Sequence, residues 1–253
     1  MRLRSVSTVI LLSAAFVPLA WATFDELGEL KRELVSWQMT HAADLSDLVE
    51  TLDDMSGPSF TDVQESDWYS SYVASVSAWG IVTGYRDKGG ELTGKFGPAE
   101  KVTVAEALKM SLEAAQVDEK TCGAAPPSLP AASQHWASAY VSCGEQKDMR
   151  LFGEKALNLN RTAKRAEVLS ILHDAFGDEI PPYVSRFRDT RGHPLEADVA
   201  YATYLGVVSG DRTAQGVDLD TFRPNAPINR AEVAKIIYMR LREDAKRQMS
   251  SAN

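Results

Sequence analysis

The sequence predicts a mainly α-helical protein built from three helix-loop-helix repeats, with a long amphipathic helix in front of them. One helical start occurs three times, as TVAE, KRAE and NRAE beginning at Thr103, Lys164 and Asn229. Two longer segments, beginning at Phe60 and Phe187, match with their turn glycines 126 positions apart. A self-similar period of this length is the signature of a repeat architecture.

The first 22 residues have the pattern of a secretory signal peptide. Arg2 and Arg4 form a positive end, and Thr8–Leu19 is apolar but short for a membrane span. Ala20-Trp21-Ala22 is a small-x-small cleavage site. We expect cleavage after Ala22 and export of the chain, the alternative being an uncleaved membrane anchor.

Residues 23–56 are predicted to form one amphipathic, coiled-coil-like helix. The apolar seam advances in steps of three and four, with one extra step of four at its centre; its members are Leu27, Leu30, Leu34, Trp37, His41, Leu45, Leu48, Leu52 and Met55. This helix either self-associates, which we favour, or folds back on the domain that follows. The SGPS run at 56–59 ends it.

The repeats are expected at 60–116, 117–177 and 187–242, with a polar tail at 243–253. Each copy reads as an amphipathic helix, an irregular loop rich in Gly, Asp and Pro, and a second helix. The middle copy is the most degenerate and holds a Pro/Ala-rich loop between Cys122 and Cys143. An even pair of cysteines in an exported chain predicts one disulfide, the alternative being two free thiols.

The repeated helix start explains its Ala and Glu but not its Arg. Asn229 and Glu232 form a capping box, and Thr103 and Glu106 repeat it. A cation in the first helical turn opposes the helix dipole, yet Arg165 and Arg230 both stand there. Two interpretations stay open. The guanidinium binds an anionic ligand at a helix N-terminus, or it pairs with a nearby carboxylate such as Asp189 or Asp211.

Trp68 and Trp136 open the first helices of their copies beside polar loops. Their rings either stack on sugar rings or fill the core, and core is the commoner outcome for Trp. Asp62 and Asp189 precede the first helices, where a cap or turn is the default role.

Composition and motifs argue against several function classes. A formal net charge of -8 argues against nucleic acid as a partner, since phosphate binding needs a basic face. The four histidines have no recognisable metal spacing, and no catalytic Ser, Cys or phosphate-loop signature is present in the sequence. We therefore expect a non-enzymatic protein with no metal and no cofactor.

The three copies resemble S-layer homology repeats. The family pattern is Phe-x-Asp, His-Trp-Ala, Gly-(Ile/Val)-Val-(Ser/Thr)-Gly, Phe-x-Pro and Thr-Arg-Ala-Glu. The matching residues are Phe60, Asp62, Trp68, Gly80, Gly84, Phe96, Pro98, Ala105 and Glu106 in the first copy; His135, Trp136, Ala137, Arg165, Ala166 and Glu167 in the second; and Phe187, Asp189, Gly206, Gly210, Phe222, Pro224, Arg230, Ala231 and Glu232 in the third.

The resemblance implies a pseudo-trimeric bundle with grooves between neighbouring repeats that bind cell-wall glycans, often polymers carrying pyruvate ketals. It implies that the Arg of the Arg-Ala-Glu motif binds the ligand carboxylate, and that a loop Gly and the Trp or Asp of the opening motif line the groove. The implied ligand-binding residues are Arg165, Arg230, Trp68, Trp136, Asp62, Asp189, Gly84 and Gly210.

Three departures from the pattern limit these expectations. Val104 stands in place of the Arg in the first copy, Pro194 stands at the Trp position of the third, and the second lacks Phe-x-Asp. We expect at most two competent grooves, with the Arg230 groove the better candidate.

The predicted function is a secreted, non-catalytic module of the cell surface, periplasm or cell envelope. Its predicted partner is a cell-wall polysaccharide or a peptidoglycan-linked polymer that carries acidic groups. The alternative is a structural oligomer or adaptor that acts through residues 23–56, with the repeats as a scaffold.

Overall fold

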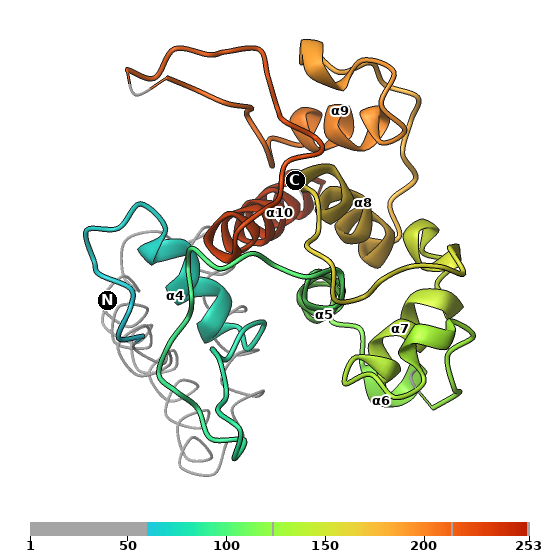
Figure 1. Ribbon diagram of the computed structural model, residues 1–253. Coiled ribbons are helices and arrows are strands. Elements are labelled where there is room, and N and C mark those ends of the chain that lie inside the picture. The colour runs from blue at the N-terminus through green and yellow to red at the C-terminus, as the bar shows by residue number, and fades with distance from the viewer. Residues whose placement is uncertain (1–59, 123, 214, 252–253) are drawn as a thin grey trace, which may run out of the picture.

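The computed structural model describes residues 60–122, 124–213 and 215–251. The expected signal peptide, at 1–22, and coiled-coil helix, at 23–56, lie outside these residues. The described residues form seven α-helices and no β-sheet, which confirms the mainly α class. The helices, shown in Figure 1, are α4 (Ser70–Ala78), α5 (Val104–Ala114), α6 (Glu119–Cys122), α7 (Ser138–Gln146), α8 (Arg165–Phe176), α9 (Glu196–Tyr204) and α10 (Arg230–Ser251).

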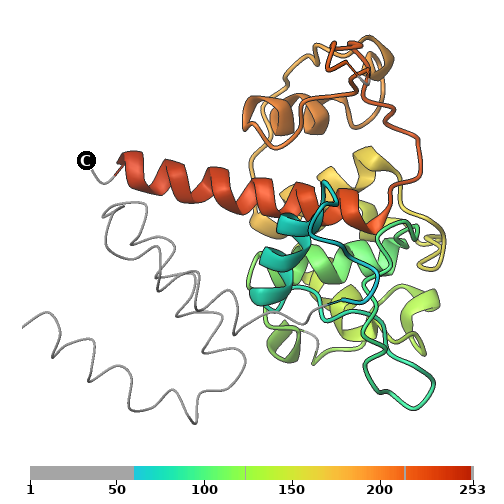
Figure 2. The same cartoon turned by 90° about the vertical axis from the view of Figure 1, so that its left-hand side faces the viewer.

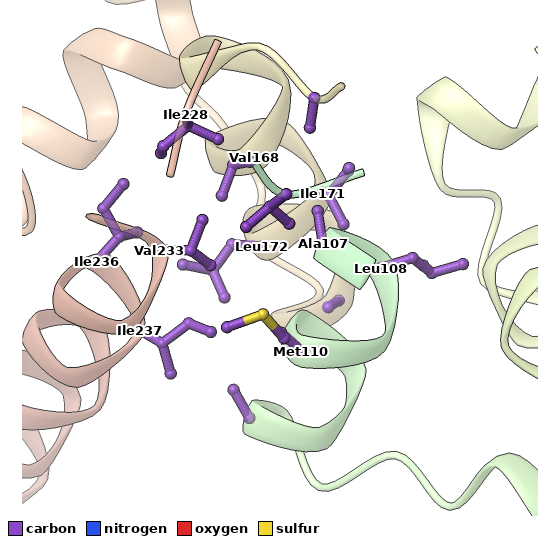
Figure 3. Packing of buried hydrophobic residues seen from close by; sticks show 14 of the residues in the cluster. Ala107, Leu108, Met110, Val168, Ile171, Leu172, Ile228, Val233, Ile236 and Ile237 are labelled. Carbon is purple, nitrogen blue, oxygen red and sulfur yellow. The ribbon is translucent and has the colours of Figure 1, made fainter. Parts of the chain in front are cut away.

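Helices α5, α8 and α10, the second helix of each predicted copy, share the centre of the core. Figure 3 shows Met110 of α5, Leu172 of α8 and Ile237 of α10 pointing toward one another. All three side chains are at most 3% exposed. Burial of apolar side chains at about 25 cal/mol per Å² is the main force that holds such helices together.

The segments that lead into these three helices are joined in a closed ring of backbone hydrogen bonds. The Val102 N–H donates to the Ile228 carbonyl at 3.1 Å, the Ile228 N–H to the Ala163 carbonyl at 3.3 Å, and the Ala163 N–H to the Val102 carbonyl at 2.8 Å. This ring supports the three-copy arrangement, although the pseudo-trimeric bundle itself stays a prediction.

Each first helix packs on the second helix of a different copy. Helix α4 contacts α10, α7 contacts α5, and α9 contacts α8, as Figure 1 shows. Each of these three interfaces therefore joins two different copies, and α4 and α10 come from opposite ends of the described residues.

The capping boxes predicted for α5 and α10 are present. The Thr103 hydroxyl and the Asn229 amide oxygen accept the Glu106 and Glu232 N–H groups at 3.2 and 2.8 Å. Their glutamates accept the N-cap N–H groups in return, at 2.8 and 2.9 Å. At α8 the N-cap is Lys164, and Glu167 accepts its N–H at 2.9 Å.

Two further features complete the fold. Cys122 and Cys143 form a disulfide, with 4.9 Å between their Cα atoms, and it ties α6 to α7. Helix α10 runs through the segment predicted as a polar tail and projects beyond the other helices (Figure 2). None of the helices within the described residues is both long and apolar enough to cross a bilayer.

Candidate functional site

Arg165 lies half-buried between the second and third copies. Its side chain is 12% exposed; Nε donates to the Phe222 carbonyl at 3.0 Å, and Nη1 donates to Glu232 Oε1 at 2.9 Å. The guanidinium carbon lies 4.9 Å from the centre of the Phe222 ring. Burial lowers the pKa of Arg165, but an arginine stays charged at neutral pH. Its carboxylate partner is thus Glu232, rather than Asp189 or Asp211.

Arg230 occupies the equivalent place between the third and first copies but is less well paired. Its side chain is 9% exposed, and Nη1 lies 3.8 Å from Glu106 Oε1. The guanidinium carbon lies 4.6 Å from the Tyr85 ring and 5.2 Å from the Phe96 ring. Its buried Nε has no hydrogen-bond partner among the described residues. A buried donor without a partner is costly, so this guanidinium retains capacity for one more acceptor.

A hollow of about 520 Å³ lies at the Tyr85 side of this interface. It is lined by Asp62, Tyr85, Lys95, Gly97 and Glu100. The Arg230 N–H donates to the Glu100 carbonyl at 2.9 Å, which fixes the start of α10 against this rim.

The Asp62 and Asp189 carboxylates both accept backbone N–H groups, and Asp62 also lines the hollow described above. The Asp62 carboxylate accepts the Phe96 and Gly97 N–H groups, both at 2.8 Å. Asp189 accepts the Phe222 and Arg223 N–H groups at 3.0 and 2.8 Å. Each aspartate therefore fixes the loop before the second helix of its own copy.

Gly84 and Gly210 have a φ of +79°, which side-chain-bearing residues rarely adopt. A Cβ on Gly84 would lie 2.8 Å from the Phe60 ring, and one on Gly210 would lie 2.3 Å from the Phe187 ring. Their positions are explained by this close approach of backbone to ring.

The first accessible cluster lies where α4 meets α10. Trp68 is 56% exposed, so it does not fill the core. Its ring meets the Tyr72 ring edge-on, with 6.4 Å between the ring centres. The ammonium of Lys235 from α10 lies 5.6 Å from the Trp68 ring and 5.7 Å from the Tyr72 ring. We call these three residues the α4/α10 cluster.

A second cluster with the same residue types lies where α7 meets α5. Trp136 is 57% exposed, and its ring centre lies 6.5 Å from that of Tyr140. The ammonium of Lys109 from α5 lies 5.7 Å from the Tyr140 ring. The Tyr140 hydroxyl donates to Glu113 Oε1 at 2.8 Å, and burial, followed by this carboxylate, raises the pKa of Tyr140. We call Trp136, Tyr140 and Lys109 the α7/α5 cluster.

The third interface, where α9 meets α8, differs from the other two. Pro194 takes the place of the tryptophan, and the buried Ser170 takes the place of the lysine. A hollow of about 410 Å³ is present there, and its lining includes His193, Pro194, Lys164 and Glu167. His193 Nε2 lies 3.3 Å from Asn225 Oδ1. Within the described residues, this interface has a cavity but no tryptophan with a lysine beside it.

Lys109 and Lys235 are the residues that sequence reasoning missed. They stand at the same position of α5 and α10, five residues after Val104 and Arg230. The signal was present in the repeat, but a single lysine on a helix is usually a solvated surface residue. Among the described residues, no group of three or more His, Cys, Asp or Glu side chains is placed to hold a metal ion.

Comparison with known families and proteins fits the resemblance. Residues 59–108 and 214–234 match the S-layer homology domain family. These segments fall in the first and third copies and include Asp62, Trp68, Gly84 and Arg230. The segments that match this family thus lie on both sides of the interface where Arg230 lies.

Three curated relatives share part of this sequence. An S-layer protein of Bacillus licheniformis is 27% identical over 203 residues, covering 78% of this chain and 21% of that protein. An uncharacterized cell wall amidase of Bacillus anthracis is 29% identical over 58% of this chain and 27% of its own length. The Middle cell wall protein of Brevibacillus brevis is 24% identical over 60% of this chain and 12% of its own length. The chain therefore spans about a quarter or less of each relative.

Proposed function

From the S-layer homology sequence in residues 59–108 and 214–234, we propose that this chain is a non-catalytic module that anchors itself to the cell envelope. It does so by non-covalent binding of an acidic cell-wall glycan in the grooves between copies. The names of the relatives, an S-layer protein and two cell wall proteins, support the cell-wall part of this proposal. The acidic group implied by the family resemblance is a pyruvate ketal.

The observation that carries the proposal is the exposure of Trp68 and Trp136. A large aromatic side chain left more than half exposed loses the free energy that its burial would give, about 1.5–3 kcal/mol for a large apolar side chain. Two such residues at equivalent places indicate a surface that a ligand covers. The apolar C–H face of a sugar ring fits a flat aromatic surface of this kind.

Charge around the two clusters selects for an acidic sugar. The chain as a whole carries a formal net charge of -8, so it does not attract anions in general. The Lys235 and Lys109 ammonium groups supply local positive charge beside the rings. Arg230, whose Nε has no hydrogen-bond partner in the part of the chain that the structure describes, adds a buried cation on α10.

The test is co-sedimentation with purified cell walls of the producing bacterium. The double substitution Trp68→Ala and Trp136→Ala removes both exposed rings and is expected to weaken binding at least about tenfold, roughly 1.4 kcal/mol. Both side chains are solvent-facing, so the variant should keep the circular dichroism spectrum and unfolding midpoint of the parent.

Tyr204→Ala provides the matched control, because Tyr204 is a 73% exposed aromatic residue on α9, in the copy that lacks the tryptophan. It should sediment with walls as the parent does. Unchanged sedimentation of a folded double tryptophan variant would refute glycan binding in these grooves.

A further inference from the structure

Each of the two tryptophan clusters contains its own lysine, but only one of the two helices that supply these lysines begins with an arginine. Helix α10 begins with Arg230, whereas α5 begins with Val104. Five residues later both helices carry a lysine, Lys235 and Lys109. The cation that is common to both clusters is therefore the lysine, and the arginine cannot be required at the α7/α5 cluster.

Both ammonium groups lie beside aromatic rings rather than against a carboxylate of the described residues. Lys235 lies within 5.7 Å of two ring centres, and Lys109 lies 5.7 Å from one. Across the described residues, neither lysine forms a salt bridge with a carboxylate. A cation held at an aromatic face keeps its charge available to an anion on its open side.

The rings fix where that anion would lie. Trp68 and Tyr72 meet edge-on, as do Trp136 and Tyr140, and each tryptophan is more than half exposed. A sugar ring on the tryptophan would place its substituents beside the lysine of the facing helix. The third interface lacks the equivalent tryptophan and the equivalent lysine, because Pro194 and the buried Ser170 stand at these positions.

We propose that Lys109 and Lys235 each bind the carboxylate of an acidic saccharide whose ring lies on Trp136 or Trp68. The chain then has two equivalent acidic-saccharide sites, at α7/α5 and α4/α10, and a third interface that does not bind. This inference rests on the proposed function, and it identifies the two lysines as the residues that bind the acidic group of the ligand. Arg165 and Arg230 then stabilise the contacts between copies, and they are not the residues that bind the ligand carboxylate at both sites.

The test combines two lysine variants with two wall preparations. Lys109→Met with Lys235→Met removes both charges but keeps much of the aliphatic stem, and the matching pair of Lys→Arg substitutions restores the charge. The probes are native walls and the same walls after chemical reduction of their carboxylates to alcohols. The methionine pair should bind native walls about tenfold more weakly, and the arginine pair should stay within about threefold of the parent.

On the reduced walls the parent should bind as weakly as the methionine pair does, and the methionine pair should lose nothing further. Each single methionine variant should reduce the number of high-affinity sites by half. Lys147→Met is the matched control, because Lys147 is an exposed lysine at the other end of α7. It should bind as the parent does.

The failures of the two proposals are distinguishable. If the double tryptophan variant loses binding while the methionine pair keeps it, the anchoring function holds and the lysine assignment is overturned. If the methionine and arginine pairs are equally weak, charge is not what the lysines supply, and the assignment is again overturned. If neither the tryptophan nor the lysine variants lose binding, both proposals fail.

Discussion

Each interface between copies has a buried part and an exposed part, and α10 takes part in both. At its start, Arg230 is 9% exposed and lies against the Tyr85 and Phe96 rings. One and a half turns later, Lys235 lies over the exposed Trp68. A buried charge must be satisfied inside the protein or it costs free energy, whereas an exposed one can serve a ligand. Two cations five residues apart on one helix thus have different physical roles.

The same contrast holds between the second and third copies. Arg165 is hydrogen-bonded to the Phe222 carbonyl and to Glu232, which joins α8 to α10. At the neighbouring α9/α8 interface, Pro194 and Ser170 stand at the positions that tryptophan and lysine occupy in the two clusters. The contact between two copies can therefore be present where the tryptophan and the lysine beside it are absent.

The largest expected effect comes from the ring packing beneath the Arg165 joint. Gly210→Ala would place a Cβ 2.3 Å from the Phe187 ring and 2.9 Å from the Thr221 carbonyl, in a backbone conformation with φ of +79°. The Phe187 ring stacks on the Phe222 ring, and the Arg165 guanidinium lies over the Phe222 ring. A shift of Phe187 must therefore also move Phe222 and Arg165. We expect a loss of about 3 kcal/mol or more in unfolding free energy, measured by urea denaturation.

Gly206→Ala is the control, because it measures the cost of placing a side chain at positive φ without a close contact to a ring. Its φ is also +79°, but the nearest atoms belong to the flexible Glu243 side chain at 3.7 Å. It should lose only about 1 kcal/mol. Equal losses for the two alanine variants would show that the ring contact is not what Gly210 provides.

Next in size is the difference in unfolding free energy between substitutions of Arg165 and of Arg230. Arg165→Met removes the hydrogen bonds to Glu232 Oε1 and to the Phe222 carbonyl, so we expect a loss of about 2–4 kcal/mol. Arg230→Met removes a looser pair, 3.8 Å from Glu106, together with an unpartnered buried Nε, and should cost about 1 kcal/mol or less. Chemical denaturation of both variants measures the difference, and a larger loss at Arg230 would reverse the assignment of the tighter joint.

A second buried arginine of α10, Arg240, pairs with Asp178, and this pair predicts that the unfolding free energy depends on pH. Burial alone would raise the pKa of Asp178, but hydrogen bonds from His173 and Arg240 outweigh it and hold the pKa at about 2. Since the folded pKa lies below the usual value of 3.8, the stabilisation is present above about pH 4 and is lost as the pH falls toward 2. We expect a loss of about 2 kcal/mol from this group over that range.

The Asp178→Asn variant tests this pH dependence. Other carboxylates also titrate below pH 4, so the informative quantity is the difference between the parent and the variant. The unfolding free energy of the parent should fall by about 2 kcal/mol more than that of the variant between pH 4 and pH 2. Parallel pH profiles would show that the Asp178–Arg240 pair does not control acid stability.

The smallest expected change in unfolding free energy is that of a substitution in the α4/α10 cluster. Lys235→Met should change the unfolding free energy by less than about 0.5 kcal/mol, because the ammonium contacts rings at the surface and forms no salt bridge within the described part of the chain. Thermal unfolding of the variant beside Arg165→Met measures this contrast. A loss above about 1 kcal/mol would place Lys235 among the structural residues.

The sequence by itself determined the helical class and the starts of α5 and α10, because these depend on local pattern. A capping box such as that of Asn229 and Glu232 needs only residues three positions apart. The repeat also located Trp68 and Trp136 at equivalent places in their copies.

Only the tertiary structure decided which copies face one another and which side chains meet there. Arg165 pairs with Glu232, 67 positions away, rather than with the aspartates that the sequence suggested. The exposure of Trp68 and the approach of Lys235 depend on α4 packing against the last helix of the chain. Burial and pairing of a side chain are set by what packs against it, and between distant segments no local pattern contains that information.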